Sequence, residues 1–96
     1  MTEDQEQRAR EYGAMRARIA SGLDRTQRLY RYQVYAQTCR ALRGNDIGAN
    51  DAAEAARDLR QIWYALGGSE ETLHATAREA AESAARDHAE EERRAA

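Results

Sequence analysis

The sequence predicts an all-α protein, a small antiparallel helical bundle or helical hairpin of three to four helices that is completed by oligomerisation. The 96-residue chain contains no Pro, which would interrupt helices. Ala, Glu, Leu and Arg together supply 53 of the residues, a share typical of long helices. Apolar side chains also recur at three- and four-residue steps along most of the chain, which is the spacing of one helix face.

The expected core is thin. Alanine accounts for 21 residues, whereas Leu, Ile and Val total ten and Phe is absent. A chain of this length is expected to form one domain, residues 1–96, and a small domain buries only a modest fraction of its surface. We therefore expect the core to be completed by association, with a second copy and with another protein as partners.

The first predicted helix spans residues 3–20. Tyr12, Met15 and Ile19 follow one another at three- and four-residue steps, so they form a single narrow apolar seam on an otherwise charged helix. Ser21 and Gly22 then interrupt the pattern, and the sequence predicts a helix break there.

The second predicted helix spans residues 24–43. Ser21 and Asp24 have the spacing of a capping box that would open it. The alternative is one long bent helix, because the apolar register runs across the interruption. The residues that carry this register are Ile19, Leu23, Tyr30 and Val34.

This second helix carries apolar side chains on nearly all sides, a pattern typical of a helix packed between neighbours or bearing an interface. Leu23, Tyr30 and Val34 share the face that we expect to meet the core. The other side mixes Arg with apolar and aromatic residues, and we predict that it binds a partner. Its members are Arg25, Arg28, Leu29, Tyr32, Tyr35, Arg40 and Arg43.

Gly44 is predicted to end this helix, because Gly is favoured just beyond a helix C-terminus. The stretch 44–51 reads as a turn-rich loop in which Ile47 is expected to pack onto the core. Asp51 is predicted to cap the next helix, 52–66, through the capping-box spacing to Glu54. The predicted core or dimer residues of that helix are Leu59, Ile62, Trp63 and Leu66.

The last predicted helix spans residues 70–94. Gly67 and Gly68 end the preceding helix, and Ser69 is a favoured N-cap residue followed by two acids that suit the helix dipole. The short connections on either side of the helix 52–66 imply antiparallel neighbours.

Charge is distributed unevenly between the two halves. Residues 1–43 contain nine Arg and five acidic residues, whereas residues 44–96 contain six Arg and twelve acidic residues. One interpretation is that the basic and acidic helices pair within the fold or across a dimer. The other is that the basic helix meets a phosphate backbone or an acidic protein.

No catalytic or cofactor signature is present. Glu71 and His74 have the Glu-x-x-His spacing of di-iron bundles, but the second such motif and the additional carboxylates are lacking, so they are weak metal candidates. Cys39 would need a neighbouring His as base, and His74 and His88 both lie on the last helix. We expect Cys39 to be a small buried apolar residue, and we expect no enzyme activity and no cofactor.

The sequence therefore favours a non-enzymatic helical protein–protein interaction module, an adaptor, regulator or inhibitor of a larger protein that works through a homo-oligomer. The alternatives are a nucleic-acid-binding accessory protein that uses the helix 24–43, and an oligomeric metal-binding protein that uses Glu71 and His74. The lone Cys39 and the lack of a long apolar segment predict a cytoplasmic protein without a membrane span.

Overall fold

The computed structural model describes residues 2–96, and this part of the chain consists of three α-helices without strands. They are α1 (Glu3–Leu42), α2 (Asp46–Ala65) and α3 (Glu70–Ala95). The molecule is elongated, with principal extents of 71 × 24 × 18 Å. The predicted all-α class is thus confirmed. None of the helices described over this range combines the length and the apolar character needed to cross a bilayer.

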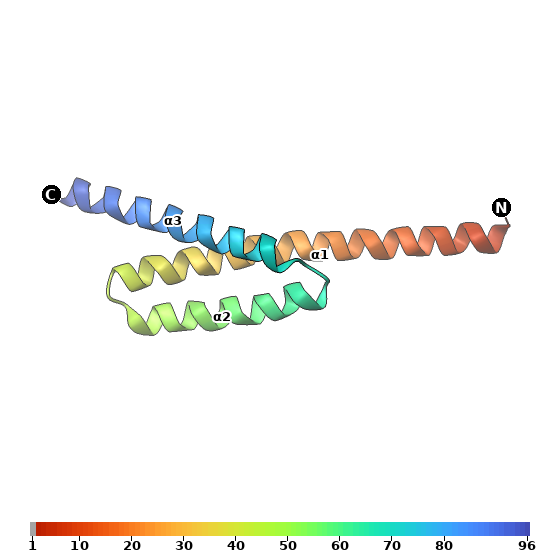
Figure 1. Cartoon of the computed structure of the whole chain (residues 1–96), viewed down its shortest axis with the longest axis horizontal. Coiled ribbons are helices and arrows are strands. Elements are labelled where there is room, and N and C mark those ends of the chain that lie inside the picture. Colours follow the sequence, from red (N-terminus) through yellow and green to blue (C-terminus); the bar gives the residue numbers. More distant parts are fainter. Residues whose placement is uncertain (1) are drawn as a thin grey trace.

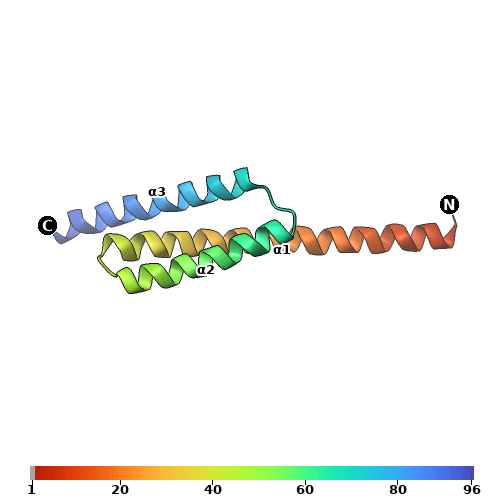
Figure 2. The ribbon, with the colours of Figure 1, turned by 60° about the horizontal axis from the view of Figure 1, so that its bottom comes forward.

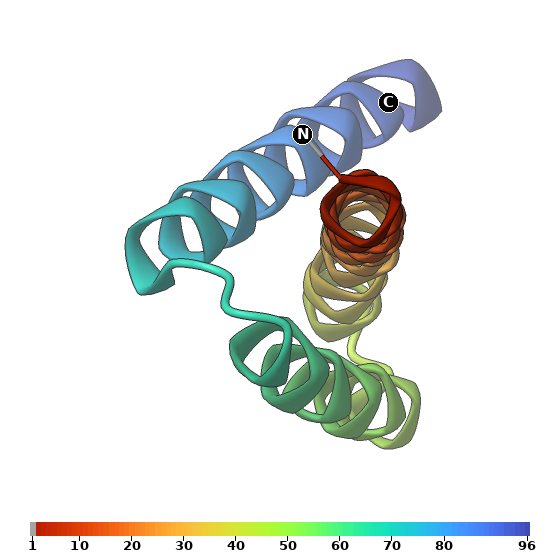
Figure 3. The same cartoon turned by 90° about the vertical axis from the view of Figure 1, so that its right-hand side faces the viewer.

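The helix α1 is the axis of the molecule. Its C-terminal half packs against both other helices. The helix α2 runs antiparallel to α1, and α3 runs in the same direction as α1 (Figure 1, Figure 2). Seen end-on, α2 and α3 lie on different sides of α1 (Figure 3). Its N-terminal half, by contrast, extends alone beyond the other two helices (Figure 1).

The predicted break between residues 20 and 24 was wrong, because α1 is continuous for 40 residues. Its N-cap is Thr2, paired in a capping box with Gln5, and Ser21 lies in the helix interior. Gly22 is retained within the helix where another side chain packs closely. A Cβ atom there would lie 3.2 Å from Leu66 Cδ1, and the Gly22 carbonyl also accepts a 2.7 Å hydrogen bond from the Thr26 hydroxyl.

The stretch predicted to be a loop, residues 44–51, is mostly helical. Gly44 adopts a φ of 78°, the left-handed conformation that ends α1 and that Gly tolerates best. Asn45 then caps α2 at once, its side-chain oxygen accepting a 3.0 Å hydrogen bond from the Gly48 amide. The helix therefore starts at Asp46, six residues before the predicted start.

Two further expectations about this stretch were wrong for the same reason. Asp51 lies inside α2 and caps nothing. Ile47 lies in the first turn of α2 with 80% of its surface exposed, and so it does not pack onto the core. At this end of α2 the buried side chains are instead the small ones of Ala49 and Ala52.

The turn between α2 and α3 is built around Trp63. Gly67 has a φ of 86°, and the Gly68 amide donates a 2.9 Å hydrogen bond to the Trp63 carbonyl. The indole Nε1 donates at 2.8 Å to the Ser69 carbonyl. Ser69 in turn caps α3, its hydroxyl oxygen accepting from the Thr72 amide at 3.2 Å.

The core is a single small cluster where the three helices meet. Its buried members are Tyr30, Ala56, Trp63 and Leu73, and the residues packed against them are Leu23, Val34, Leu59 and Ala77. Of the residues predicted for the core or a dimer, Leu66 is half-buried against α1. Ile62 lies outside the cluster, with 49% of its surface exposed.

Candidate protein interaction surfaces

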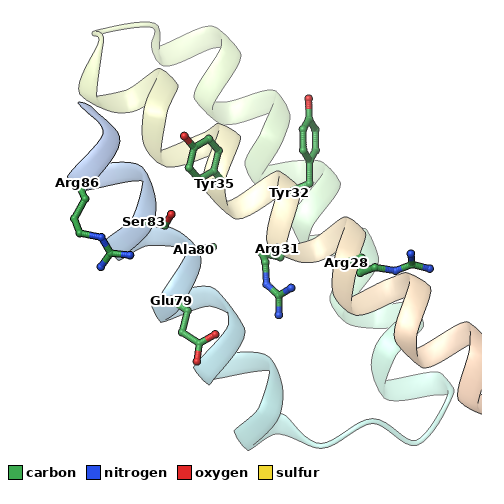
Figure 4. A pocket seen from close by; sticks show the side chains of 8 residues that line it. All are labelled: Arg28, Arg31, Tyr32, Tyr35, Glu79, Ala80, Ser83 and Arg86. Carbon is green, nitrogen blue, oxygen red and sulfur yellow. The ribbon is translucent and has the colours of Figure 1, made fainter. Parts of the chain in front are cut away.

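A groove lies between the C-terminal half of α1 and the facing side of α3. It has a volume of about 620 Å³. Its lining residues are Arg28, Arg31, Tyr32, Tyr35, Glu79, Ala80, Ser83 and Arg86. Figure 4 shows that the Arg31 side chain reaches into the space in front of α3, whereas Tyr32 and Arg28 point away from α3. The lining residues include three Arg side chains and one carboxylate, that of Glu79.

Tyr35 closes one end of this groove. Its hydroxyl donates a 2.5 Å hydrogen bond to Asp87 Oδ2, which ties α1 to α3. The hydrogen bond to Asp87, and secondarily burial, raises the pKa of the Tyr35 phenol above its usual value of 10.0. Tyr35 therefore supports the fold as well as lining the groove.

Arg40 and Arg43, which the sequence predicted to bind a partner, make contacts within the chain. Arg43 Nη2 donates to both carboxylate oxygens of Glu91 on α3, at 2.9 and 2.8 Å, and this contact raises the pKa of the guanidinium. Arg40 Nη1 donates at 3.1 Å to the Gly48 carbonyl in the first turn of α2. The basic end of α1 thus pairs in part with the acidic second half of the chain, as in the first of the two interpretations of the charge asymmetry.

Four of the predicted partner-binding residues lie together on the outer side of α1, lining a shallow depression of about 420 Å³. We call Arg25, Arg28, Leu29 and Tyr32 the α1 patch. Tyr32 exposes 62% of its surface and Leu29 42%. Arg28 pairs with Asp24 at 3.2 Å, but both side chains are solvent-exposed, and such pairs are weak. The α1 patch is therefore open to solvent.

A second surface lies on the projecting half of α1. Tyr12, Met15 and Ile19, the N-terminal seam, expose 57%, 45% and 38% of their surfaces. The Arg16 guanidinium lies 5.7 Å from the centroid of the Tyr12 ring, within the range of a cation–π contact. Every residue from 2 to 21 is exposed, so no part of residues 2–96 covers this seam.

The metal candidates lie on the surface of α3. His74 Nε2 is 3.7 Å from Glu70 Oε1, and Glu71 is exposed beside them. Across residues 2–96 no three His, Cys, Asp or Glu side chains are grouped as a metal site would require. Cys39 is buried with a free thiol, in the environment expected of a small apolar side chain.

Sequence reasoning missed the α3 side of the groove. Glu79, Ser83 and Arg86 are spaced four and three residues apart, which places them on one face of α3. That spacing was a usable signal, but only the packing of α3 against α1 shows that this face borders Arg31 and Tyr35.

Comparison with protein-family models, curated protein sequences and solved structures finds no match to this chain.

Proposed function

We propose that this chain is a non-enzymatic protein–protein interaction module, an adaptor, regulator or inhibitor that binds an acidic surface of a larger protein. The observation that carries the proposal is the α1 patch, in which the exposed side chains of Leu29 and Tyr32 lie beside Arg25 and Arg28. Tyr and Arg are the side chains most enriched at binding hot spots, and an apolar centre flanked by charge is the usual anatomy of an interface.

The scaffold beneath the patch supports this proposal. Tyr30, two residues from Tyr32, is 5% exposed in the core cluster, so the backbone that presents the patch is held by packing on both α2 and α3. A surface that is already ordered loses less conformational entropy on binding than a flexible one does. The neighbouring groove, with Arg31 and Arg86, extends the positive charge and favours an acidic partner.

The test compares two double variants. Arg28→Ala/Tyr32→Ser removes the centre of the α1 patch, and Arg57→Ala/Tyr64→Ser removes the same side-chain types from exposed positions on α2. A protein captured from the source cell would be purified and titrated against wild type and both variants. We expect the patch variant to lose at least about tenfold in affinity, as for a hot spot, and the α2 variant to match wild type. Equal affinities of the two variants would refute the proposal.

The nucleic-acid alternative has less support. Of the five Arg residues between 24 and 43, Arg40 and Arg43 are engaged within the chain, which leaves fewer groups to contact phosphates. The same two variants test it, because binding to single-stranded RNA or DNA would weaken steeply with salt and would be lost in the patch variant alone.

A further inference from the structure

We infer that the projecting half of α1 is a self-association element: residues 4–25 of two chains pair as an antiparallel, two-helix coiled coil. This inference rests on the proposed function, since it names a second copy of the chain as one partner of an interaction module. It uses the N-terminal seam, a surface separate from the α1 patch except at Arg25.

The N-terminal seam continues a face of α1 that is already used for packing. Gly22 approaches Leu66 at the end of α2, and Thr26 is 5% exposed. Met15 lies one heptad before Gly22, and Ile19 lies one heptad before Thr26. The same two heptad positions therefore continue from the seam to Thr26, and the seam is exposed because α2 ends at Ala65 while α1 extends beyond it (Figure 1).

The projecting segment lacks the contacts that normally stabilise a helix in a protein. Most helical stability in proteins comes from tertiary packing of an apolar face rather than from intrinsic helix propensity. Local interactions are present, including the Thr2/Gln5 capping box and a 3.1 Å hydrogen bond from Gln7 to Glu11. Gly13 lies in the middle of the segment with no side chain or backbone near it, and Gly disfavours helix there. A second helix on the seam supplies the missing packing.

The charges beside the seam indicate that the second helix is the same segment of another copy of the chain. Asp4, Glu11, Arg18 and Arg25 are spaced seven residues apart along one flank of the seam, so two acids are followed by two bases. In an antiparallel pair of identical helices this flank meets itself in reverse order. Glu11 then lies against the partner's Arg18, and Asp4 lies against the partner's Arg25. Because the pair is symmetric, each contact occurs twice, and all four unite opposite charges.

A parallel pair of the same helices lacks this match. It would place the acidic first turns, Glu3, Asp4 and Glu6, beside their own copies, and like charges at close approach oppose association. Opposite charges meet at all four contacts of this flank when one helix is reversed. It therefore favours a second copy in the antiparallel direction.

The apolar contacts agree with this register. Tyr12 packs on the partner's Met15, and Ile19 lies beside the aliphatic stem of the partner's Arg8. The partner's first turn then ends near a depression of about 290 Å³ at the end of α2, lined in part by Gly22, Arg25 and Leu66. With only three apolar residues per seam, the dimer is expected to be weak and reversible.

The decisive experiment exchanges charges between the two chains. Glu11→Arg and Arg18→Glu each place like charges together twice in their own homodimers, whereas a mixture of the two variants restores opposite charges at both positions. By sedimentation equilibrium, we expect each variant alone to dimerise at least about tenfold more weakly than wild type, and the mixture to regain wild-type association. Arg10→Glu makes the same charge change as Arg18→Glu, but on the far side of α1, and it should not change the association.

The direction of pairing is measured separately. A spin label at Gln5→Cys, in a chain that also carries Cys39→Ala, lies opposite residue 22 of the partner in the antiparallel register. The two labels should then be about 25 Å apart along the helix axis, against about 10 Å for a parallel pair. Circular dichroism of the labelled chain would verify that the helices are retained.

The outcomes separate the inference from the proposed function. A wild-type chain that stays monomeric up to about 1 mM, a mixture that fails to restore the dimer, or a short label distance would each overturn the inference. None of these results would affect a target whose binding depends on Arg28 and Tyr32. Conversely, an antiparallel dimer whose target binds both double variants equally would uphold the inference and refute the proposed interaction patch.

Discussion

Replacing Gly68 by Ala should displace the only Trp of the protein. A Cβ atom at residue 68 would lie 2.2 Å from Cε2 and 2.4 Å from both Cδ2 and Nε1 of Trp63, far inside the roughly 3.5–4 Å of an ordinary carbon contact. The indole ring is rigid, and only 5% of the surface of Trp63 is exposed, so the ring must move by more than 1 Å as a whole. Its 2.8 Å hydrogen bond to the Ser69 carbonyl would then be lost.

The expected cost combines two terms. Overpacking of a core typically destabilises by about 1–3 kcal/mol, and the lost hydrogen bond adds about 1 kcal/mol. We therefore expect Gly68→Ala to lower the free energy of unfolding by about 2–4 kcal/mol. Urea titration followed by the fluorescence of Trp63 measures this loss, and a changed emission maximum of the folded state would report the displaced ring.

Gly67→Ala is the matched control in the same turn. Gly67 has a φ of 86° with open space around its Cβ position, so Ala there meets a conformational cost of about 1 kcal/mol and no clash. The ring of Trp63 should stay in place in this variant. If Gly68→Ala were no more destabilising than Gly67→Ala, the close packing of Gly68 on the indole would be refuted.

Two further predictions concern the start of α2 and the α1–α3 contact. Asn45→Ala should cost about 0.5–2 kcal/mol, because it removes the N-cap of α2, whereas Asp51→Ala should stay within about 0.5 kcal/mol. Urea titrations that gave both variants the same stability would contradict the assigned helix start. Because the pKa of Tyr35 is raised in the fold, its stabilising contribution is complete below pH 10 and is lost as the pH rises beyond that value. Stability measured from pH 9 to 11 should therefore fall less steeply in Tyr35→Phe than in wild type, and identical slopes would contradict the Tyr35–Asp87 contact.

The sequence was informative wherever the determining interactions are local. Gly44 and Gly67 follow helices and adopt positive φ, because only the backbone conformation of one residue is at issue there. Ser69 caps α3 through the amide of Thr72, three residues further along the chain. The apolar spacing of Tyr30 and Trp63 likewise marked both residues for burial, because a helix face is defined within a few turns.

The errors arose where two local signals competed. Asn45 and Asp51 are both good caps, and the choice between them depends on how α2 meets α1. The Arg40 side chain donates a hydrogen bond to the Gly48 carbonyl. The small side chains of Ala49 and Ala52 let the first turns of α2 approach α1 closely. A capping box read from spacing alone contains none of this information.

By itself, the sequence determined an all-helical chain, the seam of Tyr12, Met15 and Ile19, and the surplus of Arg in its first half, because composition and periodicity are properties of the chain alone. Only the tertiary structure decided that α1 runs unbroken past Gly22 and that α2 stops beside it. The reason is physical: whether a seam is core or surface depends on which helix lies against it, and α2 is half the length of α1. The same packing engages Arg40 and Arg43 within the chain and leaves Arg28 and Tyr32 exposed.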